Sequence, residues 1–101
     1  MTIVKSPAAE SDLQEIWLTI APENPTAATR ILRAIGAKID LLADYPRFGP
    51  RRPDIRPKTR LLAEKPYLIL YETHPDTDDG PVDEVEVVRV VDGRRDLESL
   101  F

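Results

Sequence analysis

Apolar residues recur at helical spacing in two consecutive segments near the start of the chain. The first segment follows Ser6-Pro7 and the second follows Asn24-Pro25, so each places an N-cap residue before a proline that suits the first helical turn. The apolar positions are Ala9, Leu13, Ile16, Trp17 and Ile20, then Ala28, Ile31, Leu32, Ile35, Ile39 and Leu42. Because only residues 21–24 separate the two segments, the pattern predicts an antiparallel helix hairpin.

The same pattern assigns the remaining side chains of the first helix. Trp17 lies on the apolar stripe and is interpreted as a core residue. Glu10, Asp12 and Glu15 lie off the stripe and are interpreted as a solvated face.

Strand patterns follow a turn-rich segment. Residues 45–57 contain four prolines and a glycine, which predict turns. Alternating and β-branched residues then predict strands over 60–64, 67–73 and 82–91, with an additional edge strand over 2–5. Leu97, Leu100 and Phe101 are spaced for a short C-terminal helical turn. We therefore expect a single α+β domain over residues 1–101, with the helix hairpin on one face of a small, mainly antiparallel sheet of three or four strands.

The predicted sheet has apolar side chains on both faces. Strict alternation separates Tyr67, Ile69 and Tyr71 from Leu68 and Leu70. In the last strand it places Val88 and Val90 with Glu84 and Glu86, and Val85, Val87 and Val91 with Arg89. Since two helices cover one face only, the other must be covered by Phe48 and the C-terminal residues or by another chain, and we favour another chain.

Arg89 interrupts the valine-rich strand. A buried guanidinium requires an anion or several carbonyl groups, because its desolvation is otherwise costly. Asp92 and Asp96 are the candidates within the chain, and a carboxylate of a partner is the alternative.

Composition excludes several classes of chemistry. The 101 residues include no Cys and only one His, so thiolate metal sites, iron–sulfur clusters, thiol nucleophiles and cages of several imidazoles are absent, and no metal or cofactor is expected. His74 is interpreted as a solvated residue at a strand end, and Asp78-Asp79 as turn formers. No run approaches the roughly 18 apolar residues of a membrane span, so a cytoplasmic protein without membrane contact is expected.

Charge is unevenly distributed along the chain. The formal net charge of −4 argues against direct, non-specific binding of nucleic acid. Residues 47–65 nevertheless hold seven basic and two acidic side chains, whereas residues 72–86 hold seven acidic and no basic ones. We interpret the first segment as a basic patch that receives an acidic segment of a partner protein.

Several short motifs, in their order, resemble the ParE branch of the RelE/ParE toxin superfamily over residues 6–97. The motifs are Ala9, Asp12-Leu13, Glu15-Ile16-Trp17, Asn24-Pro25, Ala27-Ala28, Leu42, Pro46, Gly49, Arg60, Tyr67-Leu68-Ile69-Leu70-Tyr71 and the ending Arg89-Val90-Val91-Asp92-Gly93-Arg94-Arg95-Asp96-Leu97. The resemblance implies a toxin of a type II toxin–antitoxin system that inhibits DNA gyrase without established catalytic residues. It also implies a cognate antitoxin whose C-terminal segment wraps the toxin. Many relatives carry His at the position of Asp92.

The resemblance and the surface pattern together suggest two sets of contact residues. We expect the antitoxin in the groove of the helix hairpin and on Arg60, Leu68, Leu70, Val88, Arg89 and Val90. We expect the gyrase target on Arg94, Arg95, Leu97, Leu100 and Phe101, where cations adjoin apolar anchors. The alternative is that Arg94 and Arg95 pair with Asp92, Asp96 and Glu98 while the apolar residues dock on the sheet.

Two other functions stay open. A ribosome-dependent mRNA endonuclease of the RelE type would need Lys58, Arg60, Tyr71 and Arg89 to converge on one sheet face, although no Tyr or His follows Gly93. An inactive relative that only binds an antitoxin is the third hypothesis.

Overall fold

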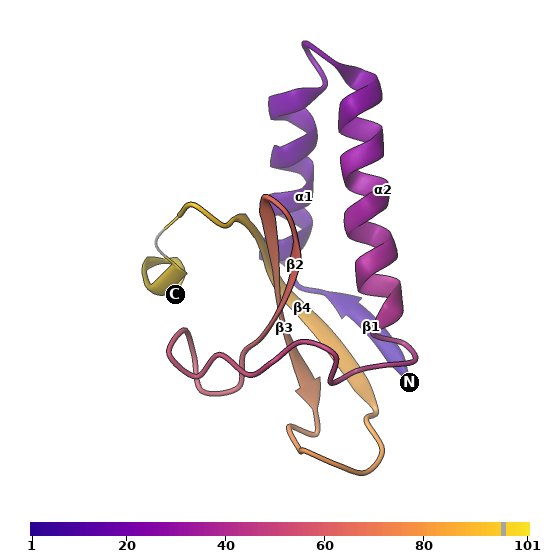
Figure 1. Cartoon of the computed structure of the whole chain (residues 1–101), viewed down its shortest axis with the longest axis vertical. Helices are drawn as coiled ribbons and strands as arrows, with labels where there is room; N and C mark the ends of the chain where they lie inside the picture. The colour runs from indigo at the N-terminus through magenta and orange to yellow at the C-terminus, as the bar shows by residue number, and fades with distance from the viewer. Residues whose placement is uncertain (96) are drawn as a thin grey trace.

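Two helices pack on one face of a four-stranded sheet in a computed structural model that describes residues 1–95 and 97–101, with the backbone alone at residue 98 (Figure 1). The elements are β1 (Thr2–Lys5), α1 (Pro7–Ile20), α2 (Pro25–Leu41), β2 (Arg60–Glu64), β3 (Tyr67–His74), β4 (Glu84–Asp92) and a 3₁₀ turn, η1 (Leu97–Leu100). The predicted α+β class, the helix hairpin and the strands are confirmed.

Both helices begin at the predicted caps. The Ser6 hydroxyl oxygen accepts the Ala9 N–H at 3.0 Å, and the Asn24 side-chain oxygen accepts the Ala27 N–H at 3.0 Å. Each bond satisfies one of the N–H groups that a helix start leaves without a partner. Ser6 also donates its hydroxyl to the Val88 carbonyl at 2.7 Å, which fixes the start of α1 to β4.

The sheet is mixed, in the order β1-β4-β3-β2. β1 pairs in parallel with β4, while β4 with β3 and β3 with β2 are antiparallel. The predicted edge strand is thus present, and its neighbour is the last strand of the chain.

A register shift in the β3–β4 pair changes which valines face the helices. Leu70 lies opposite Arg89, but Tyr71 lies opposite Val87, so Val88 is the extra residue of a β-bulge. One inserted residue exchanges the faces of all positions beyond it, because side chains alternate with a period of two. Our prediction that Val90 shares a face with Glu84 and Glu86 is therefore wrong.

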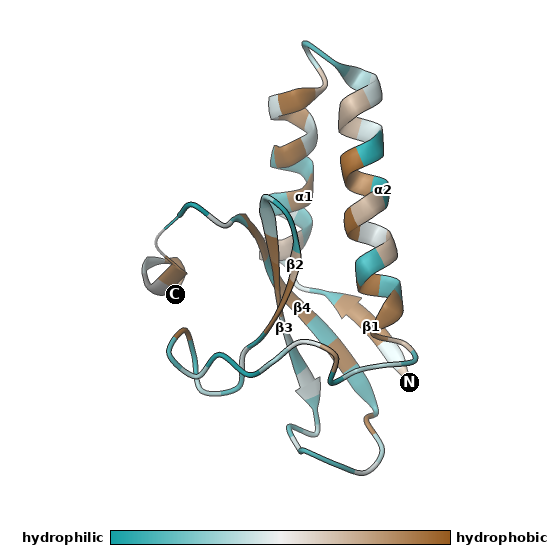
Figure 2. Ribbon diagram, viewed as in Figure 1, coloured by the Kyte–Doolittle hydropathy of each residue, from teal (hydrophilic) through white to brown (hydrophobic). Residues whose placement is uncertain are grey.

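The core lies between the helices and this corrected face. Its buried residues are Ala9, Ile16, Ile35, Ile39, Leu42, Leu62, Ile69, Tyr71, Val85, Val87 and Val90. The connecting turn of the helix hairpin projects well beyond the sheet, and the ribbon of α1 remains hydrophobic up to that end (Figures 1 and 2).

Candidate partner-binding surfaces

Arg89 is neutralised by α1 and not by the residues that follow it. Its Nε donates to Asp12 Oδ2 at 2.7 Å and its Nη2 to Asp12 Oδ1 at 2.9 Å. The Val90 N–H donates to the same carboxylate at 2.9 Å. Asp12 raises the pKa of Arg89, chiefly through these side-chain hydrogen bonds.

This arrangement overturns two predictions. Asp12 is not part of a solvated face, since its side chain is 14 % exposed. Asp92 does not neutralise Arg89 but pairs with Arg94, and Asp96 lies outside the described residues. β1 pairs with β4 only as far as Val87, so the N–H of Val90 is on a free edge that Asp12 fills.

The outer face of the sheet, opposite the helices, is partly covered by the chain itself. Leu70 is fully buried and Val91 is 3 % exposed, although α1 and α2 pack on the other face. The turn-rich segment and the C-terminus meet where the Arg56 guanidinium lies 4.5 Å from the centre of the Phe101 ring. Arg89 Nη1 also donates to the Leu100 carbonyl at 3.4 Å. The prediction of an open second face is therefore wrong at Leu70 and Val91.

The expected antitoxin-contact residues divide into two groups. Arg60, Leu70 and Val90 are buried in the chain, whereas Leu68, Val88 and Arg89 are half-buried. Only the second group can meet a partner without rearrangement.

Arg60 and Tyr71 form a buried polar contact with Gly49. The Gly49 N–H donates to the Tyr71 hydroxyl oxygen at 2.8 Å, and Arg60 Nη1 donates to the Gly49 carbonyl at 3.0 Å. Burial raises the pKa of the Tyr71 phenol, although the hydrogen bond from Gly49 and the charge of Arg60 oppose that rise. A Cβ at Gly49 would lie 2.5 Å from the Leu61 carbonyl oxygen, so only glycine fits this approach.

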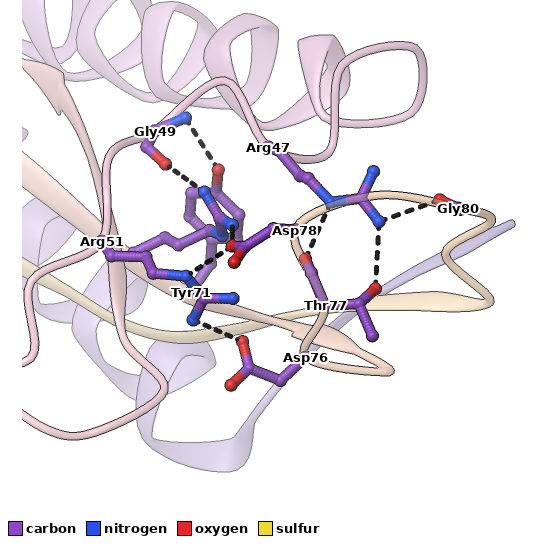
Figure 3. Close-up of polar contacts among 9 residues, drawn as sticks. Arg47, Gly49, Arg51, Tyr71, Asp76, Thr77, Asp78 and Gly80 are labelled. Carbon is purple, nitrogen blue, oxygen red and sulfur yellow. Dashed lines mark hydrogen bonds and ion pairs between the residues drawn. The ribbon is translucent and has the colours of Figure 1, made fainter.

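Arg47 holds the backbone of the β3–β4 loop (Figure 3). Its Nε donates to the Thr77 carbonyl at 2.8 Å, and its Nη2 donates to Thr77 Oγ1 at 3.1 Å and to the Gly80 carbonyl at 2.8 Å. These bonds connect the turn-rich segment to a loop about 30 residues further along the chain.

Arg51 and Arg60 hold the carboxylates of the same loop. Arg51 donates to Asp76 at 2.8 Å and to Asp78 at 3.0 Å (Figure 3). Arg60 Nη2 lies 3.7 Å from Asp78. Both carboxylates raise the pKa of Arg51. We call the three arginines that hold residues 76–80, namely Arg47, Arg51 and Arg60, the arginine clasp. The basic and acidic segments of the sequence thus bind each other, and Asp78 is an ion-pair partner in addition to a turn residue.

Polar residues on the outer face of β3 and β4 form a smaller cluster. Glu72 lies opposite Glu86, and His74 Nε2 lies 3.2 Å from Glu86 Oε1. Ligand atoms of these three side chains lie within 4.8 Å of one another. His74 is thus at a strand end, as predicted, but has a carboxylate partner there.

The residues required for an endonuclease do not converge. Arg60 and Tyr71 are opposite one another on the helix side of the sheet, whereas Arg89 is on the outer face and is held by Asp12. Lys58 is exposed on the turn-rich segment. The prediction that these four side chains share one face is wrong.

The C-terminal residues expected to contact the target are the most exposed of the predicted set. Arg94 and Arg95 are exposed, Leu97 and Leu100 are half-buried and Phe101 is 46 % exposed. Arg94 pairs with Asp92, which is one of the alternative pairings we considered. The pairings with Asp96 and with the side chain of residue 98 lie outside what the structure describes.

An open groove of about 680 Å³ lies between the two helices. Its apolar lining includes Leu13, Trp17 and Leu32. Trp17 is 38 % exposed and Leu18 is 61 % exposed, so the assignment of Trp17 to the core is wrong. Trp17 lines the groove, whereas Leu18 is exposed outside the groove lining.

A family model described as the ParE toxin of the type II toxin–antitoxin system parDE matches residues 3–97. The chain belongs to this ParE toxin family. Among curated relatives, toxin ParE1 of Mycobacterium tuberculosis is 35 % identical over 94 residues, which cover 92 % of this chain and 90 % of that protein. Toxin ParE3 of Caulobacter vibrioides is 26 % identical over 96 residues, which cover 94 % of this chain and 89 % of the relative.

The ParE fold is also found in solved structures. A chain of the chromosomal ParDE TA system from P. aeruginosa superposes with a TM-score of 0.72 at 20 % identity, covering 91 % of this chain and 95 % of that one. Among the described residues of this ParE chain, no helix is long and apolar enough to cross a membrane.

Proposed function

We propose that this ParE toxin inhibits DNA gyrase by binding to it in the cytoplasm, and that a cognate antitoxin neutralises it. The observation that carries the proposal is the match of a ParE family model to nearly the whole chain, residues 3–97. Relatives that match over about nine-tenths of this chain are themselves called ParE toxins, which supports the same assignment.

The placement of the basic side chains supports action by binding. General acid–base catalysis needs several polar groups within hydrogen-bond reach of one substrate. Here Arg60 is engaged with Gly49, and Arg89, which belongs to the outer face of the sheet, is engaged with Asp12. These residues have structural partners that an active site would have to displace.

We assign the gyrase contact to the C-terminal residues. Arg95 and Phe101 are exposed there, and they combine a cation with an aromatic side chain, as binding hot spots often do. The Phe101 ring is held by Arg56, so the aromatic group is presented in a fixed place.

Purified protein in supercoiling and DNA-cleavage assays tests the target. Inhibited supercoiling, or trapped cleavage complexes, is expected for the wild type, and Arg95→Ala with Phe101→Ala should weaken the effect. Arg33→Ala on the exposed side of α2 is the matched control and should act as the wild type. Intact gyrase activity together with truncated mRNA in a translating extract would replace this target with the endonuclease function.

We assign the first antitoxin contact to the groove between α1 and α2. Exposed apolar surface on a small protein marks interaction sites, and Trp17, which lines this groove, is 38 % exposed. Co-expression with the neighbouring reading frame should give a stable complex. A stable, monodisperse monomer that does not bind the product of that reading frame would contradict the assignment.

A further inference from the structure

The ligand of the arginine clasp has the chemistry of an acidic polypeptide. Arg47 donates to two backbone carbonyls, those of Thr77 and Gly80. Arg51 donates to two carboxylates, those of Asp76 and Asp78. Backbone carbonyls and carboxylates that alternate along a segment of chain are features of an acidic peptide. A nucleic-acid backbone offers phosphates and sugars instead.

The loop does not use all the binding capacity of these arginines. The Arg60 side chain is 6 % exposed, and its Nη2 is 3.7 Å from Asp78 Oδ1, beyond hydrogen-bonding distance. Its buried Nε has no hydrogen-bond partner among the described residues. A buried guanidinium with free donors favours any anion that approaches more closely than Asp78 does.

The outer part of the loop is also easy to displace. The Asp78 side chain is 84 % exposed, and residues 79–81 are exposed as well. Ion pairs of such exposed groups are weak and are screened by salt. Breaking the contacts between the clasp and Asp78 therefore costs little free energy.

Further positive side chains lie between the arginines of the clasp in the sequence. Arg56 and Lys58 are exposed between Arg51 and Arg60. Charges of one sign around a site accelerate the approach of a ligand of the opposite sign. An acidic segment in solution is thus attracted to the place that residues 76–80 occupy.

We propose that the arginine clasp is a binding site for an acidic polypeptide segment, filled in the free toxin by the chain's own residues 76–80. An acidic segment of the antitoxin takes the site by exchange, and in that respect the inference rests on the proposed function. The loop acts as a competitor within the same chain. The apparent affinity of the site for the acidic segment is therefore the intrinsic affinity multiplied by the fraction of molecules in which the loop has left the site.

The loop itself supplies the probe for a test. A blocked peptide with the sequence of residues 75–81, Pro-Asp-Thr-Asp-Asp-Gly-Pro, is titrated into ¹⁵N-labelled full-length protein at low salt. Binding is followed by the Nε–H signals of Arg47 and Arg51. The double variant Asp76→Asn/Asp78→Asn removes both carboxylates that hold Arg51 and should bind the peptide about tenfold more tightly than the wild type, which is about 1.4 kcal/mol.

The matched control removes the same charge from the same segment. Asp79→Asn/Asp83→Asn neutralises two exposed carboxylates for which no bond to the arginines is present among the described residues, so it should keep wild-type affinity for the peptide. Adding Arg51→Gln to the Asp76→Asn/Asp78→Asn variant should abolish the gain. Far-UV circular dichroism establishes that each variant is folded.

Three results would overturn the proposal. These are equal affinities in wild type and the Asp76→Asn/Asp78→Asn variant, an equal gain in the charge-matched control, or the same gain for a single-stranded oligonucleotide of equal charge. The third result would make the site one for phosphates. The assay contains neither antitoxin nor gyrase, so a failure of the proposed function leaves its result unaffected. An antitoxin that binds the toxin equally well after Arg51→Gln would show that the antitoxin does not use the site.

Discussion

Asp12 of α1 and Arg89 of β4 form a two-pronged ion pair across 77 positions of the chain, with distances of 2.7 and 2.9 Å. Asp12 additionally accepts the N–H of Val90, so one carboxylate receives three hydrogen bonds. The pair joins the first helix to the central strand next to the β-bulge. It thereby holds the edge of β4 where β1 no longer pairs with it.

Replacement of Asp12 should destabilise the fold. Asp12→Ala leaves the mostly buried Arg89 without its anion and Val90 without an acceptor, and a loss of roughly 3 kcal/mol in the free energy of unfolding is expected. Denaturant unfolding followed by circular dichroism measures the loss. Glu15→Ala, an exposed carboxylate on the same helix, is the control and should change stability by less than about 0.5 kcal/mol. Equal effects of the two substitutions would refute the role of the ion pair.

Tyr71 should contribute to stability through its hydroxyl group. Tyr71→Phe keeps the ring but leaves the buried Gly49 N–H without an acceptor, so a cost of about 1–3 kcal/mol is expected. Tyr45→Phe is the matched control, because Tyr45 is 60 % exposed. Hydrogen exchange of the Gly49 amide gives a second measure, since its protection should fall in Tyr71→Phe.

A substitution at Gly49 tests the close approach of the turn-rich segment to β2. In Gly49→Ala the added methyl group meets the Leu61 carbonyl oxygen at 2.5 Å and Tyr71 Cε1 at 2.9 Å, so the segment must move. Loss of stability and altered Nε–H signals of Arg60 are expected. Gly36→Ala is the control, because an added Cβ meets nothing within 4 Å there and alanine favours a helix.

Asp92 should titrate at unusually low pH. Hydrogen bonds from the Arg94 side chain and backbone lower the pKa of the Asp92 carboxyl from 3.8 to about 2. Because the pKa is depressed in the folded state, the pair contributes to stability above pH 4, and that contribution is lost as the pH falls from about 4 to 2. Carboxyl ¹³C chemical shifts measure the titration directly. In Arg94→Gln the pKa should return towards 3.8, and an unchanged value would exclude Arg94 as the cause.

The helix groove should carry antitoxin binding. Trp17→Ala removes exposed apolar surface from the lining of the groove and should weaken the toxin–antitoxin complex at least tenfold, as measured by calorimetry. Leu41→Ala is the control, because Leu41 is similarly exposed but is at the opposite end of the hairpin. If both variants bind the antitoxin equally, the contact is elsewhere.

The elements of the fold were predictable because their signals are local. Ser6 and Asn24 cap the helices from within the first turn, and the apolar periodicity needs only neighbouring residues. The bulge at Val88 was not predictable, because nothing in a run of valines and glutamates indicates where one extra residue enters the strand. The faces of Arg89, Val90 and Val91 relative to Val85 and Val87 were mispredicted for that reason.

The roles of the site residues could not be predicted, because they depend on contacts between segments that are distant in the sequence. Asp12 resembles any solvated carboxylate until the direction in which α1 crosses β4 is known. Trp17 continues the apolar stripe, but it lines the groove with Leu32 of α2 and stays 38 % exposed. The uneven charge distribution was visible in the sequence, yet only the structure shows that Arg51 finds its anions at Asp76 and Asp78 within the same chain.

The parallel pairing of β1 with β4 sets a condition on synthesis of the toxin. Thr2 pairs with Glu84, so β1 has no partner until β4, the last strand of the chain and one of the two interior strands of the sheet, is synthesised. Until then the helix hairpin has only β2 and β3 to pack on, and contacts this distant in sequence form slowly. A chain that ends before residue 84 therefore lacks the partner of β1, so the sheet is complete only once translation has passed residue 92.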